Sequence, residues 1–267
     1  AQPRSTSRGQ SRKDLGADGR RWHAPLARVA APLGGYGPSM ASRPADPGFV
    51  FDLDGTLVDS VYQHVFAWQR ALQDLDIAVP LWRVHRRIGM GSDLLAAAVL
   101  RESGHQLTAQ EREQLTQLHG KYYAEQSASV RPLPGARELL DRLDELGLAW
   151  GIATSGGKEE TAPVLDMLGV QGRCPVVTGD DVPFAKPDPH LFVAGANAIA
   201  TDPQDAVVVG DSTWDMLAAR RSGAIGVGLL TGGFAPSELV EGHAFRVYAD
   251  PMDLLEHLDE LGVRVQG

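Results

Sequence analysis

Cysteine and long apolar runs are the features that this sequence of 267 residues lacks most clearly. Cys174 is its one cysteine, which rules out an intrachain disulfide and a zinc site made of several cysteines. This usage suits a reducing compartment, and we expect a cytoplasmic protein. No apolar run approaches the roughly 20 residues of a membrane-spanning helix, so we expect no membrane association.

Positive charge is scarce in most of the chain. Lys and Arg number 25 against 34 Asp and Glu, which gives a formal net charge of -9. Residues 1–47 hold eight basic and three acidic residues, a net charge of +5, so the remainder carries -14. A body of this charge repels nucleic acid and anionic membranes, and we expect neither as a partner.

Residues 1–47 are rich in Arg, Gly, Pro, Ala and Ser and lack sustained apolar periodicity, so we expect a disordered N-terminal extension. They hold no apolar h-region, which argues against a secretory signal. The first methionine is Met40. Our hypothesis is that the native protein starts there, with an organelle transit peptide as the alternative. N-terminal sequencing of the native protein separates these two readings, because a terminus upstream of Met40 would remove the first.

From Gly48 onwards, short apolar runs alternate with amphipathic stretches. We expect buried strands at 49–51, 148–153, 175–177, 206–210 and 225–230. We expect helices at 135–146, 158–168, 188–200 and 213–222. This alternation predicts an α/β fold with a doubly wound, Rossmann-like parallel sheet and right-handed crossovers. Ligands of such sheets gather at the carboxyl ends of the strands.

Residues 61–130 interrupt the alternation, because they show only helical periodicity, as in the spacing of Val61, Val65 and Trp68. We interpret them as an inserted helical cap, with residues 48–60 and 131–267 forming the core. The insertion begins just after the first expected strand. The cap should therefore lie over the polar residues that follow that strand.

Polar groups of complementary kinds lie at four strand ends. In chain order they are Asp52 with Asp54, Thr154-Ser155-Gly156, Lys186, and Asp211 with Asp215. A carboxylate that attacks a phosphate monoester meets like charge, which costs roughly 4 kcal/mol per unit pair at 4 Å and an effective dielectric near 20. A divalent cation and a lysine reverse this repulsion. The all-oxygen ligand set suits Mg²⁺ better than zinc.

These positions belong to four motifs, FDLDGTLVDS, IATSG, AKPDP and VVVGDSTWDM. With them, residues 48 to about 260 resemble the haloacid dehalogenase superfamily, in the helical-cap branch similar to phosphoglycolate phosphatase and β-phosphoglucomutase. Four motifs in order are far more specific than a lone DxD. The resemblance implies a Mg²⁺-dependent hydrolase that forms an aspartyl-phosphate.

The resemblance also implies roles for the acidic residues. Asp52 is the expected nucleophile. Asp54 is expected to protonate the leaving oxygen, then to deprotonate the hydrolytic water, while its main-chain carbonyl binds Mg²⁺. Dehalogenases of the superfamily have no acid at this position, since halide leaves without a proton, so Asp54 argues for phosphoryl chemistry. Asp211 is expected to bind Mg²⁺ directly, and Asp215 to support it through water or through another ligand.

The remaining motif residues are expected to contact the substrate. Thr154, Ser155 and Gly156 would hold phosphate oxygens, although capping of the following helix is the simpler reading for this turn alone. Lys186 would pair with the phosphate and with Asp52.

Within the expected cap, the stretch WRVHRRIGMGS (82–92) places His85, Arg86 and Arg87 before a Gly-Met-Gly turn. We expect His85 and Arg87 to contact substrate, with a solvated basic helix face as the alternative. His64 and Trp68 lie one helical turn apart and face either the active site or, for Trp68, the apolar core.

The sequence thus predicts a phosphatase for a small phosphorylated metabolite of the phosphoglycolate or sugar-phosphate type, acting as a monomer or homodimer. A phosphosugar mutase of the β-phosphoglucomutase type is the alternative enzyme. A catalytically silent binding or regulatory protein of the same fold is the alternative from another class. A phosphonate hydrolase is disfavoured, because Lys121 is the one lysine between 61 and 130.

Overall fold

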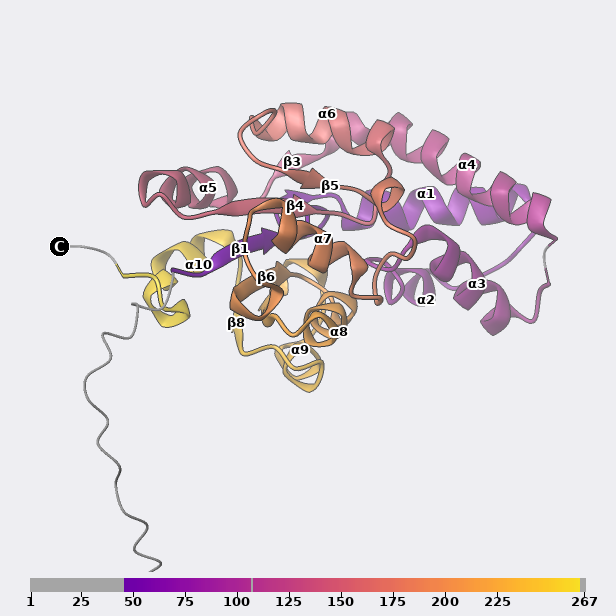
Figure 1. Cartoon of the computed structure of the whole chain (residues 1–267). Coiled ribbons are helices and arrows are strands. Elements are labelled where there is room, and N and C mark those ends of the chain that lie inside the picture. Colours follow the sequence, from indigo (N-terminus) through magenta and orange to yellow (C-terminus); the bar gives the residue numbers. More distant parts are fainter. Residues whose placement is uncertain (1–45, 107, 265–267) are drawn as a thin grey trace, which may run out of the picture. The chain divides into compact units, whose positions relative to one another are not determined.

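The computed structural model describes residues 46–106 and 108–264 (Figure 1). These residues belong to the larger of two compact units, which spans Arg43–Gly267. The expectations of disorder before residue 48 and of a start at Met40 fall almost wholly outside the described residues. Among the described residues, none of the helices combines the length and the apolar character needed to cross a lipid bilayer.

The core is a six-stranded sheet whose neighbouring strands are all parallel, in the order β5-β4-β1-β6-β7-β8. Its strands are β1 (Gly48–Phe51), β4 (Trp150–Ala153), β5 (Val176–Val177), β6 (Ala206–Gly210), β7 (Ile225–Leu229) and β8 (Arg246–Tyr248). The expected parallel α/β sheet is therefore confirmed. The sixth strand, β8, escaped the sequence analysis because it has three residues and starts with the exposed Arg246.

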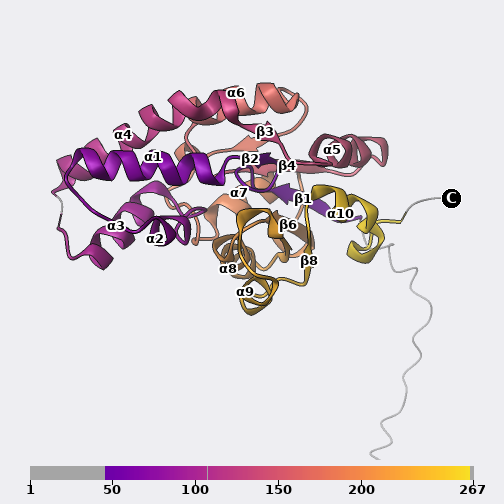
Figure 2. The same ribbon diagram turned by 180° about the vertical axis from the view of Figure 1, so that it is seen from behind.

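Helices cover both faces of this sheet (Figures 1 and 2). Side chains alternate between the faces along a strand, so Phe49 and Phe51 share one core cluster and Val50 belongs to another. The first cluster includes residues of α5 (Ala136–Glu145), α6 (Lys158–Leu168) and α10 (Pro251–Glu256). The second includes residues of α7 (His190–Ala198) and α8 (Thr213–Ser222), while α9 (Pro236–Glu241) packs in a smaller third cluster.

The described part of residues 61–130 is helical, as the periodicity predicted. It forms α1 (Val61–Asp74), α2 (Leu81–His85), α3 (Ser92–Ser103), α4 (Ala109–Gln126) and a 3₁₀ turn at Ser127–Ser129. Figures 1 and 2 show α1 and α4 side by side. Arg70 of α1 pairs with Glu125 of α4 at 2.7 Å and lies over the ring of Tyr122. The division into a core and a separate cap domain stays a prediction.

A short antiparallel pair of strands joins the beginning and the end of this helical insertion. Strands β2 (Val58–Asp59) and β3 (Arg131–Pro132) pair Val58 with Pro132 and Asp59 with Arg131. The sequence analysis did not anticipate this pair, because two-residue strands leave no periodicity. It brings both ends of the insertion to the carboxyl end of β1, which places the helices beside the residues that follow that strand.

Truncation of Leu140 in α5 should show how much the helix layer contributes to stability. Leu140 is fully buried, so we expect Leu140→Ala to lower the free energy of unfolding by about 2–5 kcal/mol. Leu94→Ala is the matched control, because Leu94 is 45% exposed and its truncation should cost only about 0.5 kcal/mol. Urea denaturation measures both, and equal losses in the two variants would contradict this packing.

Candidate active site

Three polar residues lie at one edge of the sheet because they follow adjacent parallel strands. Asp52 follows β1, Thr154 follows β4 and Asp211 follows β6, and β1 lies between the other two strands. The backbone N–H of Asp52 donates to the carbonyl oxygen of Val209 at 2.9 Å, which fixes Asp52 against β6. The structure therefore brings the first and fourth motifs together at one edge of the sheet.

Lys186 lies at the centre of this edge. Its Nζ is 2.7 Å from Asp52 Oδ1 and 2.8 Å from Asp215 Oδ1. All three residues are buried, with exposed fractions of 2% or less. Burial by itself would lower the pKa of the Lys186 ammonium, but Asp215 and Asp52 raise it above its ordinary value. Lys186 is thus a fully charged, buried cation held between two carboxylates.

The position of Asp215 follows from the start of helix α8. Ser212 is the N-cap residue, and its Oγ accepts a hydrogen bond from the backbone N–H of Asp215 at 3.3 Å. Asp215 Oδ2 accepts from the backbone N–H of Ser212 at 3.0 Å, which completes a capping box. One carboxylate therefore caps the helix through Oδ2 and binds Lys186 through Oδ1.

Asp211 is closely packed against Thr56, Gly55 and Gly232. Its Oδ1 accepts a hydrogen bond from Thr56 Oγ1 at 3.1 Å. Gly55 has a φ of 77°, and a Cβ there or at Gly232 would collide with Asp211 Oδ2. Only glycine fits these two backbone positions without displacing the carboxylate.

The cluster contains more negative charge than its lysine balances. Asp52, Asp211 and Asp215 offer carboxylate oxygens within 4.8 Å of one another, and all three are buried. Burial raises the pKa of Asp52 to about 7 and the pKa of Asp211 well above its ordinary value. An excess of buried carboxylates is costly unless a cation compensates it. A donor set of oxygen atoms only, with this excess of negative charge, fits Mg²⁺, so these residues suit the expected metal.

Asp54 is held by the first turn of the insertion. Its Oδ1 accepts a hydrogen bond from Ser60 Oγ at 2.6 Å and lies 3.2 Å from Nε2 of His64. Burial would raise the pKa of Asp54, but the charge of His64 beside it lowers that pKa below its ordinary value. In turn, burial would lower the pKa of His64, and Asp54 raises it. Asp54 and His64 therefore stabilise each other as an ion pair.

Two residues near Asp54 were missed by the sequence analysis. His119 Nε2 is 3.1 Å from His64 Nδ1, and the ring of Trp68 stacks on His119 at a centroid distance of 4.3 Å. Glu160 Oε1 is 3.8 Å from His64 Nδ1. His119 lies on the apolar side of α4 with Leu115 and Tyr123, a spacing that gave the only sequence signal for it. Nothing in the sequence linked Glu160, in the first turn of α6, to Asp54.

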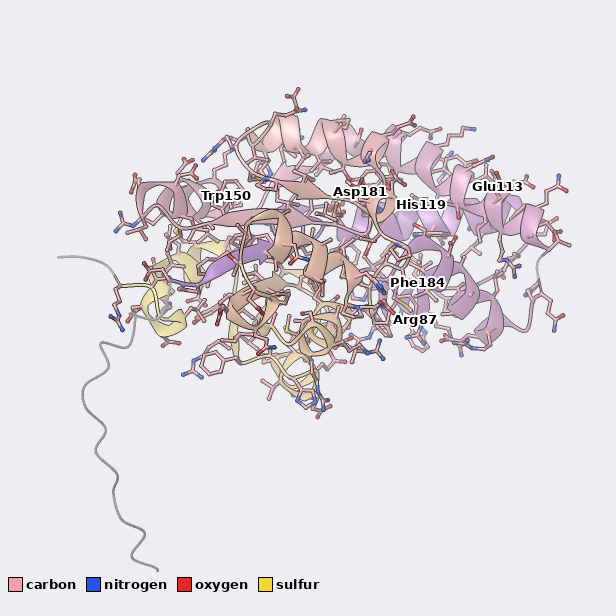
Figure 3. All side chains as sticks on the ribbon, viewed as in Figure 1. Arg87, Glu113, His119, Trp150, Asp181 and Phe184 are labelled. Carbon is pink, nitrogen blue, oxygen red and sulfur yellow. The ribbon has the colours of Figure 1, made fainter. Side chains whose placement is uncertain are left out.

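Beside Asp54 there is a small cavity of about 50 Å³. It is lined by Asp54, His64, Trp68, Ile88, Met90, Ser92, Leu95, His119, Ser155, Gly156 and Glu160. It shares Ser92, His119, Ser155 and Glu160 with a larger cleft of about 640 Å³. Figure 3 labels His119 and Phe184, which both line that cleft. The cavity and the cleft therefore give a path between the surface and Asp54.

The turn Thr154-Ser155-Gly156 follows β4 next to this cavity. Thr154 is buried, and its Oγ1 accepts a hydrogen bond from the backbone N–H of Gly156 at 3.2 Å. Ser155 Oγ donates to the carbonyl oxygen of Gly89 at 3.4 Å, and the backbone N–H of Gly91 donates to the carbonyl of Lys186 at 3.0 Å. The Gly-Met-Gly turn of the insertion is thus packed over the motif residues. Phosphate binding by residues 154–156 stays a prediction.

The structure places His85 and Arg87 away from the lining of the cavity beside Asp54. Arg87 pairs with Glu102 within the insertion (Figure 3 labels Arg87), and Arg86 pairs with Glu238 of α9. His85 Nε2 lies 2.9 Å from the carbonyl oxygen of Gly232. The charges of Arg86 and Arg87 and the Nε2 atom of His85 already have protein partners, and the expected contact of His85 and Arg87 with substrate stays a prediction without support from this geometry.

The fold and the site define a parallel α/β protein with buried carboxylates and a lysine at the strand ends. The haloacid dehalogenase-like hydrolase family matches residues 47–223, and this chain belongs to that family. A phosphoglycolate phosphatase from Agrobacterium fabrum (strain C58 / ATCC 33970) is 31% identical over 207 residues, which cover 76% of this chain and 88% of that protein.

Solved structures support the same assignment. A hydrolase from Pseudomonas syringae is 48% identical, superposes with a TM-score of 0.78, and the match covers 80% of this chain and 99% of that chain. A putative β-phosphoglucomutase from Bacteroides vulgatus has a TM-score of 0.73 and 20% identity, with coverage of 82% and 90%. At that identity the second likeness shows the fold alone. The resemblance inferred from the four motifs is confirmed.

The raised pKa of Asp52 predicts a pH-dependent stability. Because its folded pKa is about 7 and its ordinary value is 3.8, the folded state binds more protons between these values. The resulting stabilisation is complete below about pH 4 and is lost as the pH rises through about 7. Urea denaturation in EDTA should therefore show that Asp52→Asn gains stability relative to the wild type from pH 5 to pH 8.

Magnesium should remove this difference, because a bound cation favours the ionised carboxylate. At 100 times its dissociation constant, Mg²⁺ should stabilise the wild type by roughly 2.7 kcal/mol and Asp52→Asn by much less. A pH-independent difference between the two proteins, with no effect of Mg²⁺, would contradict the account of the cluster.

Proposed function

We propose that this protein is a Mg²⁺-dependent phosphatase that hydrolyses a phosphate monoester of a small metabolite through a phosphorylated Asp52. The observation that carries the proposal is the buried Lys186, bound to Asp52 among three clustered carboxylates at the strand ends. Membership of a hydrolase family and the likeness to a phosphoglycolate phosphatase support it.

Asp52 is the nucleophile. Lys186 binds its Oδ1, which fixes the carboxylate and leaves the other oxygen for attack on phosphorus. A bond forms between this oxygen and phosphorus while the bond from phosphorus to the leaving oxygen breaks. Thr154 and the turn that follows it hold the phosphate oxygens opposite Asp52.

Asp54 and His64 handle the protons. The pair holds a proton between Asp54 Oδ1 and His64 Nε2, and this proton passes to the leaving oxygen. Asp54 then takes a proton from the water that attacks the phosphorylated Asp52, which releases inorganic phosphate, frees the Asp52 carboxylate and restores the proton of the Asp54–His64 pair. One residue pair thus serves as acid and then as base.

Mg²⁺ would be held by Asp52, Asp211 and the main-chain carbonyl of Asp54, with Asp215 in support through Lys186 and Ser212. When bound, it offsets the charge of the phosphate and of the carboxylates around it. The Gly-Met-Gly turn over the site excludes bulk water from the phosphorylated carboxylate.

The geometry of the site favours the two alternatives, a phosphosugar mutase and a catalytically silent protein, less than it favours a phosphatase. A mutase needs a second phosphate site, and the basic pair Arg86 and Arg87 of the insertion is already paired with Glu238 and Glu102. A catalytically silent protein would have no need for a buried cluster whose charges cost stability. We therefore keep hydrolysis as the proposed reaction.

Turnover of p-nitrophenyl phosphate with and without Mg²⁺ tests the proposal. We expect turnover only with Mg²⁺, its loss in Asp52→Asn, and a reduction of roughly 10²–10⁴-fold in Asp54→Asn. Asp166→Asn is the matched control, because Asp166 is exposed on α6 and should leave the rate unchanged. Wild-type activity in Asp52→Asn would eliminate the proposed nucleophile.

A further inference from the structure

The path from the surface to Asp54 is acidic. Of the described residues, those that line the cavity beside Asp54 and the adjoining cleft include Asp54, Asp93, Glu160 and Asp180 but neither a lysine nor an arginine. A leaving group that carries a carboxylate would have to enter this path against like charge. An uncharged or positively charged alcohol meets no such repulsion.

The basic residues near the path are already paired. Arg87 binds Glu102 and Arg86 binds Glu238, as described above. Lys158, at the start of the helix that carries Glu160, pairs with Asp181 at 2.6 Å. His64 is held between Asp54 and His119. None of these charges is turned toward a carboxylate of a substrate.

Glu160 is the polar group placed to meet the leaving alcohol. Its Oε1 is buried and has no hydrogen-bond partner in the described structure, although it lies 3.8 Å from His64 Nδ1. A Cβ at Gly156 would lie 3.5 Å from Glu160 Oε2, so the carboxylate borders the turn proposed to bind phosphate. A buried acceptor without a donor favours a ligand that supplies one.

The cavity of about 50 Å³ has room only for the first atoms of a leaving alcohol, and its walls suit a carbon chain with polar substituents that continues into the cleft of about 640 Å³. Trp68, Ile88, Met90 and Leu95 give apolar contact, while Glu160 and His119 offer hydrogen bonds. This combination of apolar walls and a few polar groups is typical of sites for small polar ligands.

We propose that the enzyme selects phosphate esters of uncharged or amino-bearing alcohols, whose hydroxyl or ammonium group donates a hydrogen bond to Glu160, and rejects esters whose leaving alcohol carries a carboxylate. This inference rests on the proposed phosphatase function. It predicts a substrate preference that differs from the phosphoglycolate specificity in the names of several relatives.

Two matched pairs of substrates test the inference. Glycerol 3-phosphate has a hydroxymethyl group where 3-phosphoglycerate has a carboxylate, and phosphoethanolamine has an aminomethyl group, charged as an ammonium, where 2-phosphoglycolate has a carboxylate. In each pair we expect the wild-type kcat/KM of the first compound to be at least about tenfold higher, as expected from one charge-assisted contact. The pair with the larger ratio shows whether hydroxyl or ammonium is the natural donor.

Variants of Glu160 connect the preference to this side chain. Glu160→Ala should lower kcat/KM for the preferred compound roughly 10- to 100-fold and reduce both ratios. The isosteric Glu160→Gln preserves the shape of the site; it should keep glycerol 3-phosphate turnover better than that of phosphoethanolamine. Glu159→Ala is the control, because the neighbouring Glu159 is exposed, and its ratios should match those of the wild type.

The outcomes separate the inference from the function on which it rests. Three outcomes would overturn the inference alone. One is an equal or higher kcat/KM for the two carboxylate-bearing esters, and another is that the ratios do not change in Glu160→Ala and Glu160→Gln. The third is turnover of p-nitrophenyl phosphate without turnover of either glycerol 3-phosphate or phosphoethanolamine. Absence of any turnover that depends on Asp52, p-nitrophenyl phosphate included, would overturn the proposed function and the inference together.

Discussion

A buried ammonium surrounded by too many carboxylates is the constraint on which the rest of this structure depends. Lys186 contacts Asp52 and Asp215 within 2.8 Å, and Asp211 adds a third buried carboxylate to the same cluster. Replacing a buried group of charged residues by apolar residues of similar volume often leaves protein stability unchanged or raises it. The presence of this cluster therefore indicates a function rather than a contribution to stability. The remaining negative charge prepares a cation site, while Lys186 holds the nucleophile in place.

The fold produces this cluster through the ends of parallel strands. The carboxyl ends of β1, β4 and β6 bring residues far apart in sequence to one edge, and the capping box of α8 aims Asp215 at Lys186. The β2–β3 pair then returns the helical insertion to the same edge. His64 of the insertion reaches Asp54 at 3.2 Å, so the proton-handling pair is shared between the insertion and the sheet.

The sequence predicted the features that depend on local pattern. The parallel sheet and four of its helices follow from the alternation of apolar runs, and helices α6 (Lys158–Leu168) and α8 (Thr213–Ser222) begin and end at the predicted residues. Asp52, Lys186, Asp211 and Asp215 meet as the motifs implied. Pairing across the structure was not predictable, because nothing local indicates that Arg87 would bind Glu102 or that Glu160 and His119 would flank His64.

The most direct test of the account is a crystal structure of the protein with Mg²⁺ and beryllium fluoride, which mimics a phosphorylated aspartate. The account predicts a trifluoride group bonded to a carboxylate oxygen of Asp52, with a metal ion between Asp52 and Asp211 and with Lys186 still bound to Asp52. A fluoride group bonded elsewhere, or an Asp52 carboxylate turned away from an empty metal position, would contradict it.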